Sequence, residues 1–234
     1  MTTTGTQDGG GMPPTSPTST GSGNPKPYAL RFSVDYPDRP LDKLTTALRI
    51  LWVIPILFVL AGVTGFSGTW ESSSNSDGWG FFAGAGSGII FLAPLLMIVF
   101  RQKYPRWWWD FNVQLLRFQA RVGMYFLLTT DKYPSTDEEQ SVHLDADYPD
   151  VEKDLNRWLP LVKWLLALPH WIILIFLYVA AFFVLIYVWF VILFTGRYPR
   201  GAFDFIIGVS RWGYRVQAYA LLLNTDVYPP FSLE

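Results

Sequence analysis

The sequence predicts an all-α integral membrane protein made of two tandem units, each a transmembrane hairpin followed by an amphipathic interfacial helix. Half of the 234 residues are hydrophobic and only 16% are charged, against roughly 25% charged in ordinary soluble domains. Long, nearly uncharged apolar segments run over residues 48–66, 81–100 and 159–194, and about 20 apolar residues in a helix span a bilayer. The string "KYPRWWWDF" at 103–111 also returns as "RYPRGAFDF" at 197–205, each time just after an apolar segment.

The chain begins with a Thr/Ser/Gly/Pro-rich segment over residues 1–27. This segment lacks the charged start and the apolar stretch of a signal peptide. Its composition buries too little apolar surface to offset the entropy of ordering, so we expect a disordered tail. Insertion into the membrane would then be directed by the first apolar segment.

Further motifs recur in the same order and define the repeated unit. They are "SVDYPD" (33–38) with "LDADYPD" (144–150), "LLTTDKYP" (127–134) with "LLNTDVYP" (222–229), and Pro55 with Pro169 inside the apolar runs. Self-similarity in a fixed order identifies the structural unit. The predicted units are residues 28–134 and 142–234, joined by an acidic linker over 135–141. Each unit begins with a short extended element at its Asp-Tyr-Pro motif.

The first unit contains two predicted spans, over about 48–66 and 81–100. The polar loop 67–80 between them has no Lys or Arg, whereas basic residues flank both spans on the other side. The positive-inside rule places the loop outside and both flanks in the cytoplasm.

The second apolar segment, 159–194, is long for one span and short for two. Its 36 residues exceed the bilayer thickness unless the helix tilts strongly, since a helix rises about 1.5 Å per residue. A hairpin preserves the repeat and keeps the basic flanks on one side, although no Gly or Pro marks a turn near its middle. We therefore predict two short spans, giving four spans and cytoplasmic termini, with a three-span chain as the alternative.

The Tyr-Pro exits predict where the chain leaves the membrane. Proline lacks an amide donor and biases the preceding residue away from the helix, so the helix ends there. Aromatic side chains and arginines beside it suit the headgroup layer. The predicted interfacial aromatic anchors are Tyr104, Trp107, Trp108, Trp109 and Tyr198.

Each exit continues into a predicted interfacial helix, over about 107–128 and 203–223, that carries one charged stripe. Asp110, Arg117 and Arg121 fall on one helix face at 100° per residue, and the second copy repeats the pattern. One interpretation is a binding surface for anionic phospholipid or an acidic partner. The other is helix anchoring with an internal ion pair. The candidate contacts are Arg106, Asp110, Arg117, Arg121, Arg200, Asp204, Arg211 and Arg215.

Few other residues suggest a site. Gly80, Gly84 and Gly88 form a small-residue stripe that would permit close helix packing, but a glycine-rich loop explains the same letters. His143 lies beside two aspartates, where surface solvation is a simpler explanation than metal binding. His170 is interpreted as a hydrogen-bonded packing or interfacial residue. The chain has no cysteine, and nothing predicts a metal site, a cofactor or a catalytic constellation.

The motifs "GRYPRGAFDF", "RW-x-YRV-x-AY" and "TD-x-YPPFSL" give the chain a resemblance to a bacterial membrane family catalogued as domain of unknown function 4389. The resemblance covers roughly residues 28–232, in two copies, and is strongest over 144–232. In the first copy "FRQKYPRWWWDF" replaces the Thr-Gly exit. The resemblance implies the membrane class and brings no established chemistry.

We therefore expect a non-enzymatic accessory or scaffold protein of the bacterial cytoplasmic membrane that organises a membrane complex or local lipid. A small channel or lipid-handling transporter is the first alternative, although the spans lack the acids that coupled transport usually needs. An interfacial enzyme on lipid substrates is the second. A net charge of −1 gives no indication of a nucleic-acid partner.

Overall fold

The structure is a computed structural model that describes residues 28–37, 40–64, 92–136, 138 and 140–234. The predicted disordered tail lies outside these residues. In chain order the elements are β1 (Leu30–Val34), α1 (Lys43–Thr64), the π-helix η1 (Met97–Arg101), α4 (Arg106–Phe126), β2 (Val142–Ala146), α5 (Val151–Asp154), α6 (Pro160–Leu166), α7 (Leu168–Thr195), α8 (Arg200–Gln217) and the π-helix η2 (Ala218–Leu222).

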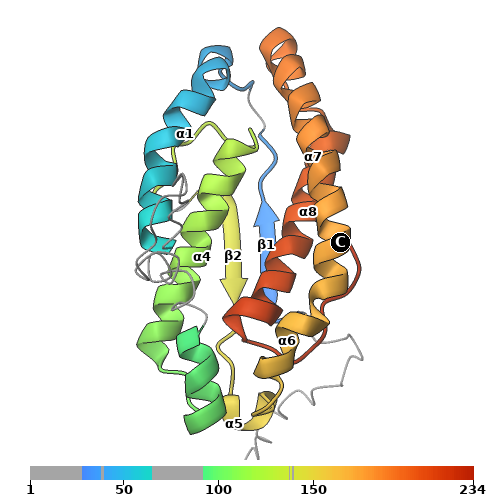
Figure 1. The fold of residues 1–234 in the computed structure, drawn as a ribbon. Coiled ribbons are helices and arrows are strands. Elements are labelled where there is room, and N and C mark those ends of the chain that lie inside the picture. Colours follow the sequence, from blue (N-terminus) through green and yellow to red (C-terminus); the bar gives the residue numbers. More distant parts are fainter. Residues whose placement is uncertain (1–27, 38–39, 65–91, 137, 139) are drawn as a thin grey trace, which may run out of the picture.

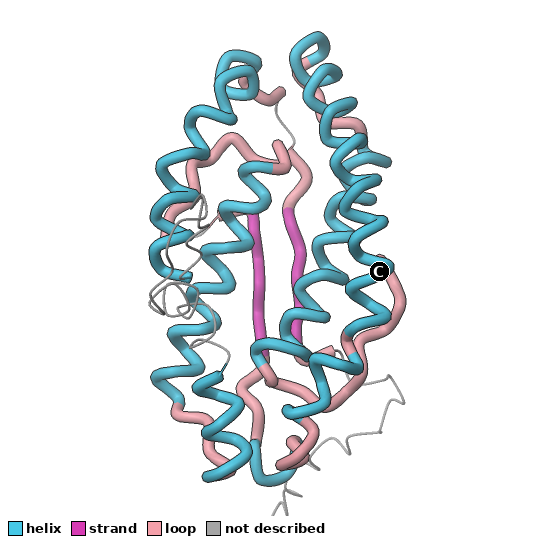
Figure 2. Tube along the Cα trace, viewed as in Figure 1, coloured by secondary structure: helices cyan, strands magenta, loops and turns pink. Residues whose placement is uncertain are grey.

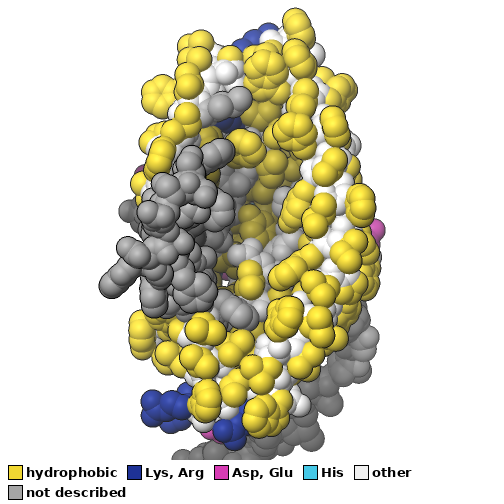
Figure 3. All heavy atoms as spheres, in the orientation of Figure 1, with side chains coloured by type: hydrophobic (Ala, Val, Ile, Leu, Met, Phe, Trp, Pro, Cys, Tyr) yellow, Lys and Arg dark blue, Asp and Glu magenta, His cyan; other side chains and the backbone are white. Residues whose placement is uncertain are grey.

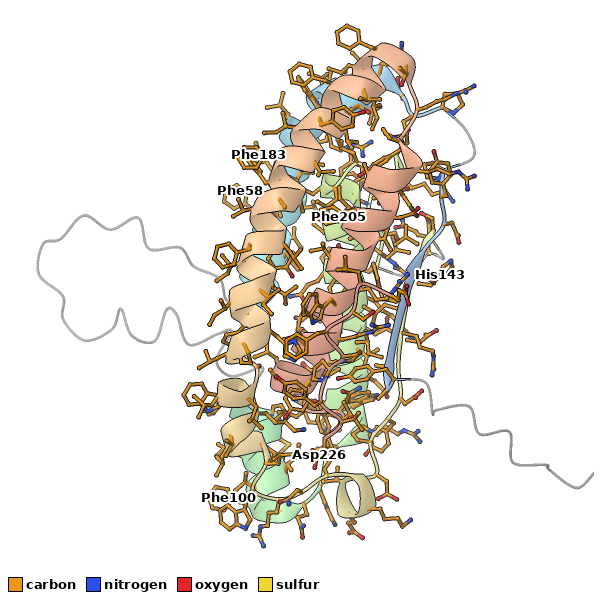
Figure 4. The ribbon with its side chains drawn as sticks, turned by 90° about the vertical axis from the view of Figure 1, so that its right-hand side faces the viewer. Phe58, Phe100, His143, Phe183, Phe205 and Asp226 are labelled. Carbon is orange, nitrogen blue, oxygen red and sulfur yellow. The ribbon has the colours of Figure 1, made fainter. Side chains whose placement is uncertain are left out.

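These elements form three layers. The strands β1 and β2 make one outer layer, α4 and α8 the middle layer, and α1 and α7 the other outer layer (Figures 1 and 4). The side chains labelled in Figure 4 mark the order, with Phe58 and Phe183 on the outer side of the α1–α7 layer and His143 on the sheet. Polar and apolar surfaces are therefore separated across the thickness of the molecule.

The sheet corrects the prediction of an all-α protein. β1 and β2 pair antiparallel, with Phe32 opposite Leu144, and they run side by side in Figure 2. Both strands alternate buried and exposed side chains, which is the pattern of a strand with one covered face. The extended elements expected at the Asp-Tyr-Pro motifs are thus paired with each other, a long-range contact that local sequence does not indicate. The described part is otherwise mostly helical, as predicted.

The second apolar segment does not form the predicted hairpin. After the short α6, α7 is one unbroken helix of 28 residues, about 42 Å long at 1.5 Å per residue. Pro169 lies in its first turn, where a missing amide donor costs nothing. Because the middle has neither Gly nor Pro, nothing there interrupts the helical hydrogen bonds.

In the described residues, α7 is the one continuous helix long and apolar enough to cross a membrane. A second appears if α1 is counted as a single span despite a 53° bend between Arg49 and Leu51. Pro55 explains that bend, because its ring displaces the carbonyl four residues earlier. Of the predicted span 81–100 only the helical part from Leu92 is described. The loop 67–80 and the stripe of Gly80, Gly84 and Gly88 lie outside the described residues.

The helices α4 and α8 begin directly after the prolines of the two Tyr-Pro motifs. Pro105 and Pro199 stand at the N-cap positions of α4 and α8 in extended conformation. Each helix buries one face, including Val113 and Leu116 on α4 and Ile206 on α8. Their order across the layers is crossed: β2 packs on α4 and β1 packs on α8. The strand of each half of the chain therefore lies against the helix of the other half.

Candidate functional site

Two arginines of the predicted stripes hold the strands onto the helices. Arg117 Nε donates to the Leu144 carbonyl oxygen at 2.8 Å, and Arg211 Nε donates to the Phe32 carbonyl oxygen at 3.0 Å. Phe32 and Leu144 are opposite each other in the sheet. A two-stranded sheet leaves outer carbonyls unpaired, and these guanidinium groups satisfy one on each strand.

The remaining stripe residues are placed differently from the predicted internal ion pair. Arg117 pairs with Asp145 on β2 at 2.9 Å instead of with Asp110. Arg121 donates to the Ser135 carbonyl oxygen at 2.6 Å. Arg215 is half-buried, and burial, followed by the nearby Arg211, lowers its pKa. Lipid binding by the stripes stays a prediction, with the exposed Asp110 and Asp204 as its outermost members.

Each Tyr-Pro exit receives a tyrosine from the opposite half. Tyr148 Oη donates to the Tyr104 carbonyl oxygen at 2.5 Å, and Tyr36 Oη donates to that of Tyr198 at 2.5 Å. Arg106 lies over the Tyr148 ring at 5.0 Å, and Arg200 lies over the Tyr36 ring at 4.6 Å. Arg106 and Arg200, which the sequence predicted to contact lipid headgroups, therefore make cation–π contacts with tyrosine rings of the protein itself.

The predicted aromatic anchors divide into buried and exposed side chains. Tyr104, Trp109 and Tyr198 are buried, so they pack inside the protein rather than lie at its surface. Burial also raises the pKa of the Tyr104 and Tyr198 phenols. Trp107 is exposed and Trp108 is half-buried. Contact with headgroups stays a prediction for these two tryptophans.

A buried cation that the sequence analysis did not single out lies in the first half. The Arg49 side chain is 2% exposed and pairs with Asp131. Its Nη1 donates to the carbonyl oxygens of Tyr125 at 3.1 Å and Thr130 at 3.0 Å, and its guanidinium lies 4.7 Å from the centre of the Tyr125 ring. The arginine thus joins α1 to the end of α4.

The second half contains the same arrangement with a lysine. The Lys163 side chain is 0% exposed, pairs with Asp226 at 2.8 Å and donates to the Thr225 carbonyl oxygen at 2.6 Å. Its ammonium lies 5.1 Å from the centre of the Tyr219 ring. Burial lowers the pKa of Lys163, and Asp226 opposes that shift by favouring the charged form. We call these two groups the Arg49 cluster and the Lys163 cluster.

One signal in the sequence could have found both clusters. Arg49 and Lys163 each stand six residues before the proline of their apolar run, and the aspartates belong to the repeated "TD-x-YP" motif. These residues are separated by more than 60 positions, so only the assumption that equivalent residues share a role would have paired them. A buried charge needs a partner, and that requirement supplies the missing step.

The two histidines differ in burial. His170 is buried, accepts a hydrogen bond from Trp212 Nε1 at 3.1 Å and stacks on Phe231 with ring centres 4.0 Å apart. The prediction of a hydrogen-bonded packing residue is confirmed. His143 is exposed on the sheet with Nε2 3.2 Å from Asp35. Among the described residues there is no group of three or more His, Cys, Asp or Glu side chains that could hold a metal ion.

A larger feature is an apolar pocket of about 440 Å³ between α1 and α7. Five of its lining residues come from α7, namely Phe182, Leu185, Ile186, Trp189 and Phe190. Thr46 and Arg49 supply its polar side chains. Its volume is within the range of about 300–1,000 Å³ that is usual for small-molecule sites. The arrangement offers shape, an apolar wall and a few hydrogen-bonding groups, which suits binding.

Comparison with known proteins gives one match. Residues 158–232 match the family model described as domain of unknown function (DUF4389), in one copy. The matched part runs from before α6 to beyond η2, so it contains the Lys163 cluster, α7 and α8. No curated protein and no solved structure matches the chain significantly.

Proposed function

We propose that this protein is a membrane accessory or scaffold protein that lies in one leaflet of the bacterial cytoplasmic membrane. Its α1–α7 layer enters the lipid, and its sheet faces water as the surface that meets a protein partner. The two halves are proposed to be tandem copies of one unit. Two contacts support the duplication, because each occurs once in either half. Arg117 and Arg211 each donate to a strand carbonyl oxygen, and Tyr148 and Tyr36 each donate to the carbonyl oxygen of a Tyr-Pro motif.

The observation that carries the proposal is the separation of surfaces across the three layers. The outer side chains of α7 are large, apolar and exposed, including Phe176 at 71% and Phe183 at 64%, and Phe58 on α1 is 74% exposed. Figure 3 shows hydrophobic side chains covering this face over α1 and α7. An exposed apolar face of this extent marks contact with lipid or protein. A buried core helix of a soluble protein would not leave its apolar side chains open.

The opposite face carries charges that do not suit lipid. Arg31 and Asp147 pair at 2.9 Å with side chains 50% and 55% exposed, and His143, Asp35 and Asp145 are exposed beside them. The strands run along the same direction as α7 (Figures 1 and 4). If α7 stood upright in a monomer, these charges would lie at bilayer depth, at a cost of about 2.5–3.5 kcal/mol each by insertion scales. A chain lying in the plane of the membrane keeps them in water.

The basic residues agree with this orientation. α4 begins at one end of the molecule and α8 at the other (Figure 1), so the two Tyr-Pro exits are at opposite ends. An upright α7 would place one exit on each side of the membrane, whereas the positive-inside rule favours both on the cytoplasmic side. If α7 lies in the plane of the membrane, both Tyr-Pro exits meet the same headgroup layer. This proposal replaces the four-span arrangement expected from sequence.

Cysteine labelling tests the orientation, since the chain has no cysteine of its own. The sites are Lys103→Cys and Arg197→Cys at the two exits, Ser33→Cys on the sheet, and Phe183→Cys on the apolar face as the matched control. With a membrane-impermeant maleimide, the first three should react in inside-out vesicles and stay unlabelled in intact cells, and Phe183→Cys should react in neither. Labelling of Lys103→Cys and Arg197→Cys from opposite sides would establish an upright α7 and end the proposal.

The accessory role has its own test. A photo-crosslinking amino acid at Ser33 should give one discrete protein adduct in cells, because Ser33 is on the proposed partner surface. The same amino acid at Phe183 should give lipid adducts. A Ser33 variant that inserts normally and forms no protein adduct would contradict the scaffold role.

A further inference from the structure

Two residues that line the pocket between α1 and α7 each have a buried side-chain polar atom without a hydrogen-bond partner. Thr46 is 0% exposed, and its Oγ1 has no partner. The Arg49 side chain is 2% exposed, and its Nε also has none. Leaving a buried polar group unsatisfied costs about 1–3 kcal/mol. Both residues line the same pocket and stand three positions apart on α1. Residues at this spacing are neighbours on one helix face, so one bound group between them could satisfy both atoms.

The other Arg49 atoms are already used. Nη1 donates to two carbonyl oxygens and Nη2 contacts Asp131. The carboxylate of Asp131 balances the charge of the guanidinium, so the site has no net charge to attract an anion. What remains is the Nε–H donor and a hydroxyl that donates or accepts. A neutral oxygen acceptor is therefore the matching chemistry.

The rest of the pocket is apolar and adjoins the exposed face of α7. Phe182, Ile186 and Phe190 line the α7 side of the pocket. Phe126, the last residue of α4, and Leu128 just beyond it also line the pocket. Figure 3 shows the face between α1 and α7 hollowed, with hydrophobic side chains around the hollow. A ligand here would have a long apolar part and one neutral hydrogen-bond acceptor. In a chain that contacts lipid, an acyl chain with its ester carbonyl has this chemistry.

We infer that this pocket binds one ester-linked lipid, with an acyl chain between α1 and α7 and an ester carbonyl oxygen that accepts hydrogen bonds from Arg49 Nε and Thr46 Oγ1. The inference goes beyond the proposed scaffold role. It requires only that the α1–α7 layer meets lipid and holds for either orientation of α7. The Lys163 cluster has a primary ammonium in place of the guanidinium, so it lacks the Nε donor.

The test measures binding of dioleoyl phosphatidylcholine to the purified full chain in detergent by native mass spectrometry. The wild-type chain should bind one molecule saturably. A diether analogue, which lacks the ester carbonyls, should bind about fivefold more weakly, because it loses the acceptor. Thr46→Val removes the hydroxyl, and Arg49→Lys keeps the charge for Asp131, as Lys163 does for Asp226. In the double variant the ester lipid should bind no more tightly than the diether.

Two variants of α7 separate the pocket from the general apolar surface. Ile186→Trp places bulk into the pocket and should weaken binding at least fivefold. Ile172→Trp makes the same change at an exposed α7 position outside the pocket and should leave binding unchanged. Ile172 is 57% exposed, against 41% for Ile186. Equal binding by both would overturn the assignment.

The remaining outcomes also decide the inference. Wild-type binding that does not distinguish the ester from the diether would remove the carbonyl contact. Much tighter binding of dioleoyl phosphatidylglycerol, lost in Arg49→Lys, would make the site a headgroup site and overturn the neutral acceptor. Melting curves of each variant verify folding. If Arg49→Lys does not fold, Thr46→Val alone must still reduce the difference between ester and diether.

Discussion

Removing the acid of the Lys163 cluster should destabilise the protein more than removing the base. Asp226→Asn removes the negative charge that balances a fully buried ammonium and leaves it neutral neighbours, namely the Thr225 carbonyl oxygen and the Tyr219 ring. Leaving a buried charge without its counter-ion costs about 3–5 kcal/mol. Lys163→Met leaves a carboxylate that is 21% exposed and still accepts from the Asn156 amide at 2.6 Å. Water reaches that group, so we expect a smaller cost of about 1–3 kcal/mol.

The assay is thermal unfolding in mild detergent, followed by circular dichroism at pH 7. One kcal/mol corresponds to about 2–4 °C in a chain of this size, so Asp226→Asn should lower Tm by about 6–20 °C. The double variant Lys163→Met with Asp226→Leu should regain most of the loss, because no unpaired buried charge remains. Asp204→Asn changes an exposed aspartate and is the matched control, expected within about 0.5 kcal/mol of wild type.

The pH dependence of the Asp226→Asn variant gives the sign of the effect. Burial lowers the pKa of Lys163, and the variant removes the carboxylate that opposes this shift. A lysine with a lowered pKa in the folded state is penalised while it is charged, and the penalty fades as the pH rises and the amine loses its proton. The Tm deficit should therefore shrink between pH 7 and pH 10. A deficit equal to that of Asp204→Asn, or one larger for Lys163→Met, would refute the reasoning.

Three further predictions concern the contacts between the halves and the helix ends. Tyr148→Phe removes the hydrogen bond to the Tyr104 carbonyl oxygen and should cost about 1 kcal/mol, measured by Tm against the exposed Tyr187→Phe. Arg211→Lys should cost about 1–2 kcal/mol, because one ammonium cannot bridge the carbonyl oxygens of Phe32 and Leu233 as the guanidinium does; equal stability of the lysine variant would disprove a geometric role. Gly196→Ala should cost about 1 kcal/mol, since Gly196 ends α7 with φ of 71°, whereas Gly201→Ala, in open space on α8, should stabilise by about 0.5–1 kcal/mol.

Much of the helical layer could be predicted because its signals are local. The apolar run around Val188 and the buried faces of α4 and α8 follow from periodicity, and Pro105 and Pro199 indicate where those helices begin. The failure at α7 came from favouring symmetry with the first half over the lack of a helix breaker in the run. The absence of Gly and Pro from the middle of the run would have predicted the single helix that α7 forms.

The sheet and the clusters depend on contacts that no local pattern specifies. β1 and β2 are five residues each, and their partners are distant along the chain. Periodicity predicted that the stripe arginines share one helix face, but the strand carbonyl oxygens that Arg117 and Arg211 bind belong to the opposite half. The π-helix η2 was also not predicted, although the spacing of the recurring motifs indicates it: Tyr219 follows Tyr125 by 94 residues, and Asp226 follows Asp131 by 95. One extra residue inside a helix is what a π-bulge accommodates.

The crossed packing of the strands has a consequence for biosynthesis. When β2 leaves the ribosome, α4 is already made, so this strand finds its helix at once. β1 has no such helix, because the Phe32 carbonyl oxygen is bound by Arg211, 179 residues later. At about 5–20 residues per second, that delay lasts roughly 10–35 s. β1 therefore has no helix to pack against until α8 has been made, and α8 then completes the sheet layer that β1 began.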